Sequence, residues 1–303
     1  MPPIIKYKFD HLDAETNAFV SRALEQVRST VYKVEYPALK MRSLVPFTSE
    51  INPGAEAFVQ HWYDRTGKAR VTSDYGKAGP RVDIVAGEYT QVIRTIEVAY
   101  GLSMQEMRAS QFAGINLMAR KAEAARDAVE TTIDDIALNG DSSTGLKGLL
   151  NVEGASTLTL GATWVSATSL QMLADLHSFA RKIRVDSNSV EDPDTLVMPA
   201  GAYYKISNTR MSADNSRTVL QTFLEQSGNL KEVTYYDKLN TANKAVCYKK
   251  DPSKLRFEIP MAFNQLQPQF VGKEYVTECE ARVAGMVADK PKSILIIDGF
   301  GSL

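Results

Sequence analysis

Residues 100–151 read YGLSMQEMRASQFAGINLMARKAEAARDAVETTIDDIALNGDSSTGLKGLLN. Within this stretch, Ser103 and Glu106 have the spacing of a capping box, in which each side chain binds the backbone N–H of the other residue. The spacing predicts that a helix begins directly after the serine. We expect this helix to run to about Phe112 and to loosen at Gly114.

A second, longer helix is expected to follow and to end at about Asn139, where Gly140 supplies the residue after the last turn. Its apolar residues recur at steps of three and four, which places them on one face. They are Ile115, Met118, Ala122, Ala125, Val129, Ile133 and Ile136. About 25 residues give a helix roughly 38 Å long. The small residues in this stripe indicate that a sheet or another backbone lies close along it.

Before this stretch, residues 57–63 and the alternating residues 92–100 are strand-like. Between them, residues 63–81 (YDRTGKARVTSDYGKAGPR) contain one aliphatic residue larger than alanine, Val71. Such a segment cannot bury itself in its own domain, and long loops without structure are usually functional or disordered. We therefore expect either a mobile hairpin tip or an arm whose side chains find partners on another subunit. In the second case, the expected contact residues are Arg65, Lys68, Arg70, Lys77 and Arg81.

The remaining chain mixes helices and strands. Residues 13–33 carry a helical apolar stripe, and residues 1–12 are expected to form an extended arm. Further helices are expected at residues 169–184 and through Leu220, Phe223 and Leu224, with residues 207–217 as a polar loop between them. Strands are expected at residues 157–160, 196–199, 233–235, 245–248 and 255–259, with a long two-strand ending within residues 274–298. Because no regular strand–helix–strand rhythm is present, the pattern predicts the α+β class.

The composition excludes several classes of protein. The 35 Lys and Arg residues against 36 Asp and Glu residues give a net charge of −1, which removes overall basic character as an argument for nucleic-acid binding. Cys247 and Cys279 form no CxxC pattern and are expected to be free, buried thiols in a reducing compartment. The sequence contains no signal-peptide core and no membrane-length apolar run. We expect synthesis in a cytoplasm and no membrane association.

No catalytic motif is complete. The segment GDSSTGLK, residues 140–147, approaches a phosphate loop, but Leu146 interrupts its glycine–lysine pair and a helix, not a strand, precedes it. Asp134 and Asp135 are neighbours on the long helix and point about 100° apart. They therefore predict a solvated helix end and not a pair of catalytic carboxylates.

Metal-binding patterns are also incomplete. An acidic turn approaches a calcium loop but lacks the glycine at its sixth position and the closing glutamate. Its members are Asp186, Asn188, Glu191, Asp192 and Asp194. His61 and His177 have no Cys, His or Glu at ligand spacing. We expect no metal, no cofactor and no enzyme activity.

The order of these parts resembles the major capsid proteins of tailed bacteriophages, which have the Hong Kong 97-like fold. The resemblance is most specific from Tyr100-Gly101-Leu102-Ser103, through the long helix, to Leu138-Asn139-Gly140-Asp141 and the TGLKGLLN of residues 144–151. It extends from about residue 13 to residue 298 and is weak in the middle third. It implies a structural protein that assembles itself into the icosahedral shell around a phage genome.

The resemblance also implies a division of labour along the chain. Residues 1–46 would form the N-terminal arm and helix, and residues 47–102 the extended β-hairpin loop, lying over a neighbouring subunit, with its flanking strands. Residues 103–152 would be the peripheral domain with its spine helix. Residues 153–255 would be the axial domain, in which the polar loop 207–217 lines the centre of the capsomer. Residues 256–303 would be return strands of the peripheral domain.

The implied partners are other copies of the chain in pentamers and hexamers, a portal and packaged double-stranded DNA. The expected location is the virion capsid, assembled in the cytoplasm of a bacterial host. Because the fold begins within about 13 residues of Met1, we expect no cleaved scaffolding segment; a separate scaffolding protein, or none, is expected instead. Lys68 and Lys77 lie in the loop where some relatives cross-link, but no motif identifies an Asn partner. Two alternatives are an encapsulin-type bacterial shell, which its enzyme cargo would distinguish, and an enzyme of an unrecognised α+β family.

Overall fold

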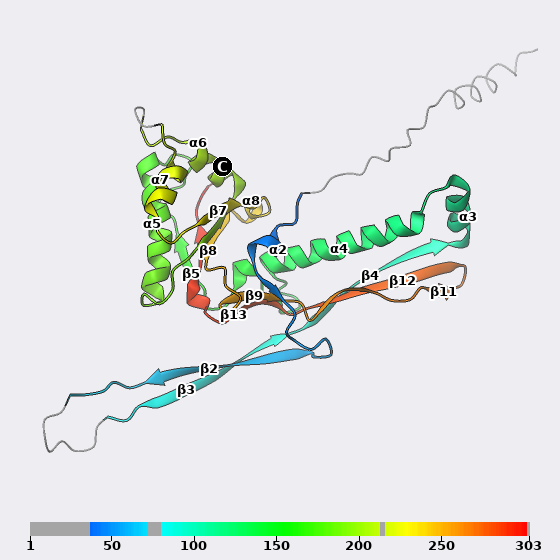
Figure 1. The fold of residues 1–303 in the computed structure, drawn as a ribbon, viewed down its shortest axis with the longest axis horizontal. Helices are drawn as coiled ribbons and strands as arrows, with labels where there is room; N and C mark the ends of the chain where they lie inside the picture. The colour runs from blue at the N-terminus through cyan, green and yellow to red at the C-terminus, as the bar shows by residue number, and fades with distance from the viewer. Residues whose placement is uncertain (1–36, 72–79, 213–215, 302–303) are drawn as a thin grey trace, which may run out of the picture. The chain divides into compact units, whose positions relative to one another are not determined.

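The computed structural model describes residues 37–71, 80–212 and 216–301. The helices and strands of the described residues all belong to one unit, Leu39–Leu303 (Figure 1). The expected extended arm and N-terminal helix, residues 1–12 and 13–33, lie outside the described residues.

Helices and strands are mixed along the chain. The helices are α2 (Met41–Leu44), α3 (Met104–Ala113), α4 (Leu117–Asn139), α5 (Ser169–Asp186), α6 (Ala200–Asn208), α7 (Val219–Gln226) and α8 (Leu239–Ala242). The strands are β1 (Phe47–Thr48), β2 (Ala57–Thr66), β3 (Asp83–Val92), β4 (Arg94–Ser103), β5 (Ser156–Thr159), β6 (Thr195–Met198), β7 (Glu232–Tyr235), β8 (Lys244–Tyr248), β9 (Leu255–Glu258), β10 (Met261–Gln265), β11 (Gln269–Val271), β12 (Glu274–Val283), β13 (Gly285–Ala288) and β14 (Ile294–Asp298). This mixture confirms the predicted α+β class.

The predicted capping box and helix pair are present. Ser103 Oγ accepts a hydrogen bond from the backbone N–H of Glu106 at 3.1 Å, and the Glu106 carboxylate accepts one from the Ser103 N–H at 3.0 Å. Helix α3 ends at Gly114, whose φ of +67° is a left-handed conformation that glycine adopts without strain. Helix α4 follows and ends at Asn139, as the sequence predicts.

The apolar stripe of α4 is buried over only part of its length. Ala125, Val129 and Ile133 are buried in the core, whereas Met118, nearer the start of the helix, is 36% exposed. Ile115, just before the helix, is 42% exposed. At the start of α4, apolar side chains are therefore left partly uncovered by the described residues.

A long antiparallel sheet lies along α4 (Figure 1). Strand β4 pairs with β12 over ten residues, from Arg94↔Val283 to Ser103↔Glu274, and β10 and β11 pair with the other edge of β12. Ile96 on β4 packs against the core that contains Val129 and Ile133 of α4. The small residues of α4 predict that a sheet lies close along the helix, and this face of the long sheet is that surface.

A second sheet has the strand order β5-β14-β8-β6-β7 and packs with α5, α6 and α7 around a separate core. Large side chains fill this core, among them Trp164 and Phe300, whose rings meet edge to face with centroids 4.9 Å apart. Cys247 lies in this core and Cys279 in the long sheet, and both are free and buried, as expected.

The structure corrects two expectations about strand partners. The strand at residues 57–63 pairs with β3, which ends at Val92 and which the sequence pattern missed, whereas residues 94–103 form β4 in the long sheet. Both faces of the β2–β3 ribbon are largely exposed, so no strong alternation of apolar and polar residues marks β3.

The strands of the closing segment, residues 256–303, belong to different sheets. Its last strand, β14, lies between β5 and β8 in the five-stranded sheet. The run Ile294–Ile297 is buried on both faces there, which is the environment that a continuous aliphatic strand requires. Strand β14 therefore lies in the same sheet as strands of residues 153–255, the segment that was expected to form the axial domain without it.

Candidate assembly surfaces

The hairpin β2–β3 is exposed over most of its length. Ten residue pairs, from Ala57↔Val92 to Thr66↔Asp83, form its antiparallel ladder. Large apolar side chains are exposed on both of its faces: Val59, Trp62, Tyr63, Ile84 and Val85. A two-stranded ribbon has no core of its own, and exposed apolar groups of this kind usually mark an interaction surface.

The base of the hairpin is fixed to the body. Gln91 is buried, and its Nε2 donates hydrogen bonds to the carbonyl oxygens of Ala284 and of Met286, the latter at 3.1 Å. Gln60 Nε2 donates to a carboxylate oxygen of Asp289. In contrast, the polar contacts of the distal half that join described residues lie within the ribbon. The Trp62 ring lies over Gly87, where a Cβ atom would come within 2.4 Å of it.

The predicted contact residues lie at the distal end of this hairpin but do not converge on one point. Arg65 is on β2 opposite Ile84, whereas Lys68, Arg70 and Arg81 lie in the segments that follow β2 and precede β3. These four basic side chains are exposed and, within the part of the chain that the structure describes, form no ion pair. The fifth, Lys77, lies outside the described residues.

A groove of about 550 Å³ lies beside the base of the hairpin. Trp62, Tyr89 and Met286 contribute apolar surface to it, and Lys147 and Glu153 contribute charge. Burial raises the pKa of Tyr89, and the nearby Glu153 carboxylate adds to the rise. The tyrosine therefore stays protonated at neutral pH. The lining offers apolar contact and opposed charges but no nucleophile with an adjacent base.

Asp134 is a polar residue whose burial differs from the expectation. It is only 4% exposed, whereas the sequence pattern predicted a solvated helix end. Its carboxylate accepts hydrogen bonds from the backbone N–H of Met41 at 3.0 Å, from Lys238 Nζ at 2.9 Å and from the Tyr236 hydroxyl. Asp135, the next residue, is exposed and pairs with Lys238 at 2.6 Å, so the prediction is correct for it alone.

The pKa values in this cluster follow from its burial and charge. Burial and the hydrogen bond to Asp134 raise the pKa of Tyr236, which keeps its hydroxyl a donor. Burial lowers the pKa of Lys238, but the hydrogen bonds to Asp135 and Asp134 outweigh it and give a net rise. The cluster thus holds the Asp134 carboxylate with three fixed donors. It joins α2, α4 and the segment before α8, and its role is structural.

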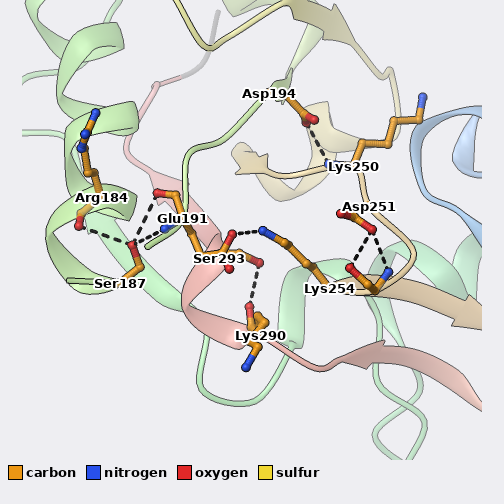
Figure 2. A network of polar contacts seen from close by, with 10 residues as sticks. Arg184, Ser187, Glu191, Asp194, Lys250, Asp251, Lys254, Lys290 and Ser293 are labelled. Atoms are coloured by element: carbon orange, nitrogen blue, oxygen red, sulfur yellow. Dashed lines mark hydrogen bonds and ion pairs between the residues drawn. The ribbon is translucent and has the colours of Figure 1, made fainter. Parts of the chain in front are cut away.

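The acidic turn that approaches a calcium loop is occupied by internal contacts (Figure 2). Glu191 forms an ion pair with Lys254, and its backbone N–H donates to Ser187 Oγ at 3.1 Å. Asp194 accepts the Lys250 N–H at 2.8 Å. Among the described residues, no group of three or more His, Cys, Asp and Glu side chains is arranged to hold a metal ion.

The remaining motifs also have structural explanations. The segment 140–147 closes on itself through the bridge Asp141↔Leu146, and the Asp141 carboxylate accepts from Ser143 and Thr144. His177 contacts Gln226 at 3.1 Å. In the described part of the chain, no helix combines the length and the apolar character that crossing a membrane requires.

The exposed hairpin, the long sheet under α4 and the structural use of the buried polar groups together define a class: a structural subunit that assembles with other subunits into a shell. The chain belongs to the major capsid protein family, because the model of that family matches residues 67–300, more than half of its length.

Solved structures support the same fold. The capsid of Myoviridae phage XM1 is similar with a TM-score of 0.81 and 18% identity, covering 92% of this chain and 98% of that one. Mycobacterium phage Adephagia gives a TM-score of 0.66 at 13% identity, covering 93% and 96%. A virus-like particle from Pyrococcus furiosus gives 0.52 at 13% identity, covering 85% and 91%. Among curated protein sequences, no match was found.

Proposed function

We propose that this chain forms the icosahedral capsid that encloses the genome of a tailed phage, as pentamers and hexamers of identical subunits. The membership of the major capsid protein family supports a shell-forming structural protein found in virion capsids. The proposed arrangement of subunits rests on one observation: the hairpin β2–β3 is fixed at its base and exposed on both faces. Identical subunits in heterologous contact close into rings and shells, so every hairpin finds a neighbour.

In this proposal the distal hairpin residues Arg65, Lys68, Arg70, Lys77 and Arg81 contact an adjacent subunit. A separate scaffolding protein and a portal assist assembly in the cytoplasm of the bacterial host. The packaged double-stranded DNA makes non-specific contacts with the shell, and the net charge of −1 gives the chain no strong overall attraction to its phosphates. The protein has no catalytic role.

Electron microscopy and sedimentation of the purified chain test this function. We expect closed shells, or rings of five and six subunits, when the chain is expressed alone or with the scaffolding candidate encoded beside it. A compact monomer under both conditions would contradict the proposal. Shells filled with a co-purifying enzyme, with no nucleic acid packaged in the native particle, would favour an encapsulin-type compartment instead.

A further inference from the structure

Several strands cross at the point where the base of the hairpin joins the body. Strands β3, β9 and β12 end there, and the chain continues from them as β4, β10 and β13. Arg282, near the end of β12, lies opposite Met261 of β10, and three residues later Gly285 lies opposite Glu258 of β9. Thr48 of β1 pairs with Glu258 from the other side. This crossing, which we call the junction, therefore brings Thr48, Glu258 and Arg282 together on adjoining strands.

Two of the polar side chains in the junction are almost completely buried. Glu258 is 1% exposed, and Gln91, near the end of β3, is 2% exposed. Glu258 Oε1 accepts a hydrogen bond from Arg256 Nε at 2.7 Å, and the Gln91 amide nitrogen donates to backbone carbonyl oxygens of β13 and of the residue before it. A Cβ atom on Gly285 would come within 3.1 Å of Gln91 Nε2, so the Gln91 amide lies beside the residue that pairs with Glu258.

Four buried polar atoms of the junction have no hydrogen-bond partner among the described residues. They are Thr48 Oγ1, Gln91 Oε1, Glu258 Oε2 and Arg282 Nε. Buried polar groups are nearly always paired, because an unpaired group loses its hydration without compensation. Six side-chain atoms in the described part of the chain are in this condition, and four of them lie in the junction. Their concentration at one place indicates a shared ligand.

Water complements the hydrogen-bonding capacity of these four atoms. Arg282 Nε–H can only donate, Gln91 Oε1 and a carboxylate oxygen can only accept, and the Thr48 hydroxyl can do either. A buried water typically makes about three hydrogen bonds to groups that are otherwise unpaired. A metal cation fits less well, because the Arg256 guanidinium already pairs with Glu258 and the Arg282 guanidinium adds a second positive charge.

We propose that the junction binds internal water, which bridges Glu258 Oε2 to Arg282 Nε, to the Thr48 hydroxyl and to Gln91 Oε1. This water connects β1, β3, β9 and β12, and it ties the hairpin to the body through the oxygen of Gln91, whose nitrogen already binds β13. A bridging water is nearly as favourable in enthalpy as a direct hydrogen bond. The site lies within one subunit, so the proposal does not depend on the shell-forming function and either can fail without the other.

A structure of the unaltered chain at a resolution that shows ordered solvent tests the site directly. We expect solvent density about 2.6–3.2 Å from Glu258 Oε2 and from at least one of the other three atoms. A direct contact between Arg282 Nε and Glu258 Oε2 that excludes solvent would overturn the proposal. So would a metal ion, which oxygen distances of about 2.0–2.6 Å and loss of the density after treatment with a chelator would identify.

Oxygen-17 magnetic relaxation dispersion detects long-lived internal water in solution and tests the site by substitution in the unassembled subunit. Thr48→Val removes one hydroxyl at nearly constant volume, and we expect the dispersion amplitude to fall by the contribution of at least one water molecule. The matched control is Thr195→Val, because Thr195 is buried in β6 and its hydroxyl donates directly to Asp194 at 3.0 Å. This control should keep the wild-type amplitude. An unchanged amplitude in Thr48→Val, or an equal fall in both variants, would refute the water site.

Amide hydrogen exchange tests the link between the water and the hairpin. At the base of the hairpin, the Ile93 N–H donates to the Glu56 carbonyl oxygen at 2.8 Å. Thr48→Val should make exchange at Ile93 roughly tenfold faster and leave exchange in β6 unchanged, because the lost water bridge weakens only the local hold on the base. Wild-type exchange at Ile93 in a variant that has lost the water would show that the water does not anchor the hairpin and would overturn that part of the proposal.

Discussion

The hairpin β2–β3 and the five-stranded sheet both form regular hydrogen-bonded ladders, yet they differ in what supports them. Strands β6 and β14 are buried on both faces, and Val197 and Leu295 have no exposed surface. In the hairpin, Ile84 is 67% exposed at a comparable position of its ladder. Because burial of apolar surface is the main stabilising term in folding, the sheet is held by its own chain. In our proposal, a surface of another subunit covers the hairpin.

This contrast leads to different mutational responses. Changes in the body should lower the stability of the isolated subunit, whereas changes in the distal hairpin should leave it unaltered and impair assembly. Five predictions test the contrast, in order of decreasing effect on the stability of the subunit.

Ile133→Asp should have the largest effect. Ile133 is 1% exposed in the core between α4 and the long sheet, and an aspartate there would be a buried charge without a partner. We expect a loss of more than about 4 kcal/mol, which is a large part of the stability of an ordinary domain. Thermal melting of the unassembled subunit measures it.

Met118→Asp on the same helix is the control and should cost less than about 1 kcal/mol, because that position is partly exposed. If both variants lose the same amount of stability, the apolar stripe of α4 is not divided into a buried part and a partly exposed part.

Asp134→Asn should have the second-largest effect. An asparagine can still accept the Met41 N–H, but its amide N–H₂ would face the donors of Tyr236 or Lys238. We expect a loss of about 2–4 kcal/mol in denaturant unfolding, because a buried charged network loses its acceptor.

The matched control is Asp135→Asn. Its carboxylate is exposed, and ion pairs at the surface contribute about 0–1 kcal/mol. If Asp134→Asn and Asp135→Asn destabilise the subunit equally, the buried cluster does not anchor α2 to α4.

These residues also show what the sequence could and could not predict. The capping box at Ser103 and the ends of α4 follow from local rules, so they were predicted correctly. The burial of Asp134 depends on Tyr236 and Lys238, about one hundred positions further along the chain. No local pattern reports such a contact. The only signal was the position of Asp134 beside the buried Ile133.

Strand partners were missed for a related reason. An alternation of side chains predicts a strand but not its neighbour, so β14 could be assigned to either sheet until its pairing with β5 and β8 was known. For the candidate site, the sequence located Arg65, Lys68, Arg70 and Arg81 on an exposed segment, because an apolar-poor segment cannot be buried. It could not identify the surface that they contact, since that surface belongs to another subunit in our proposal.

Ser103→Ala should have a smaller and local effect. Helix α3 buries none of its residues, so it depends strongly on its N-terminal cap. We expect a loss of about 1 kcal/mol, measured as faster amide hydrogen exchange within α3 and unchanged exchange in α4. Faster exchange throughout both helices would show that α3 is not an independent unit.

The same cap should weaken in acid. The hydrogen bond from the Ser103 backbone and the contact with Lys121 lower the pKa of Glu106 below its ordinary value of 4.5. A lowered carboxylate pKa stabilises the folded state fully above pH 4.5, and this contribution is lost as the pH falls through the folded-state pKa. Glu106→Gln should remove this part of the pH dependence of exchange in α3. A variant with the wild-type pH profile would contradict the assignment.

Replacing Arg65, Lys68 and Arg70 together by alanine should have the smallest effect on the subunit and a large one on assembly. The three side chains are exposed and unpaired in the described structure, so we expect the free energy of unfolding to change by less than about 0.5 kcal/mol. Loss of about 1.4 kcal/mol per subunit contact would weaken each contact tenfold, which sedimentation velocity detects as a shift from shells to free subunits.

A control that replaces Arg181, Arg184 and Lys231 by alanine removes three exposed basic residues from the body and should assemble normally. If both triple variants assemble like the wild-type chain, the distal hairpin is not held by its basic residues, and the exposed apolar groups such as Trp62 and Ile84 must provide the contact instead.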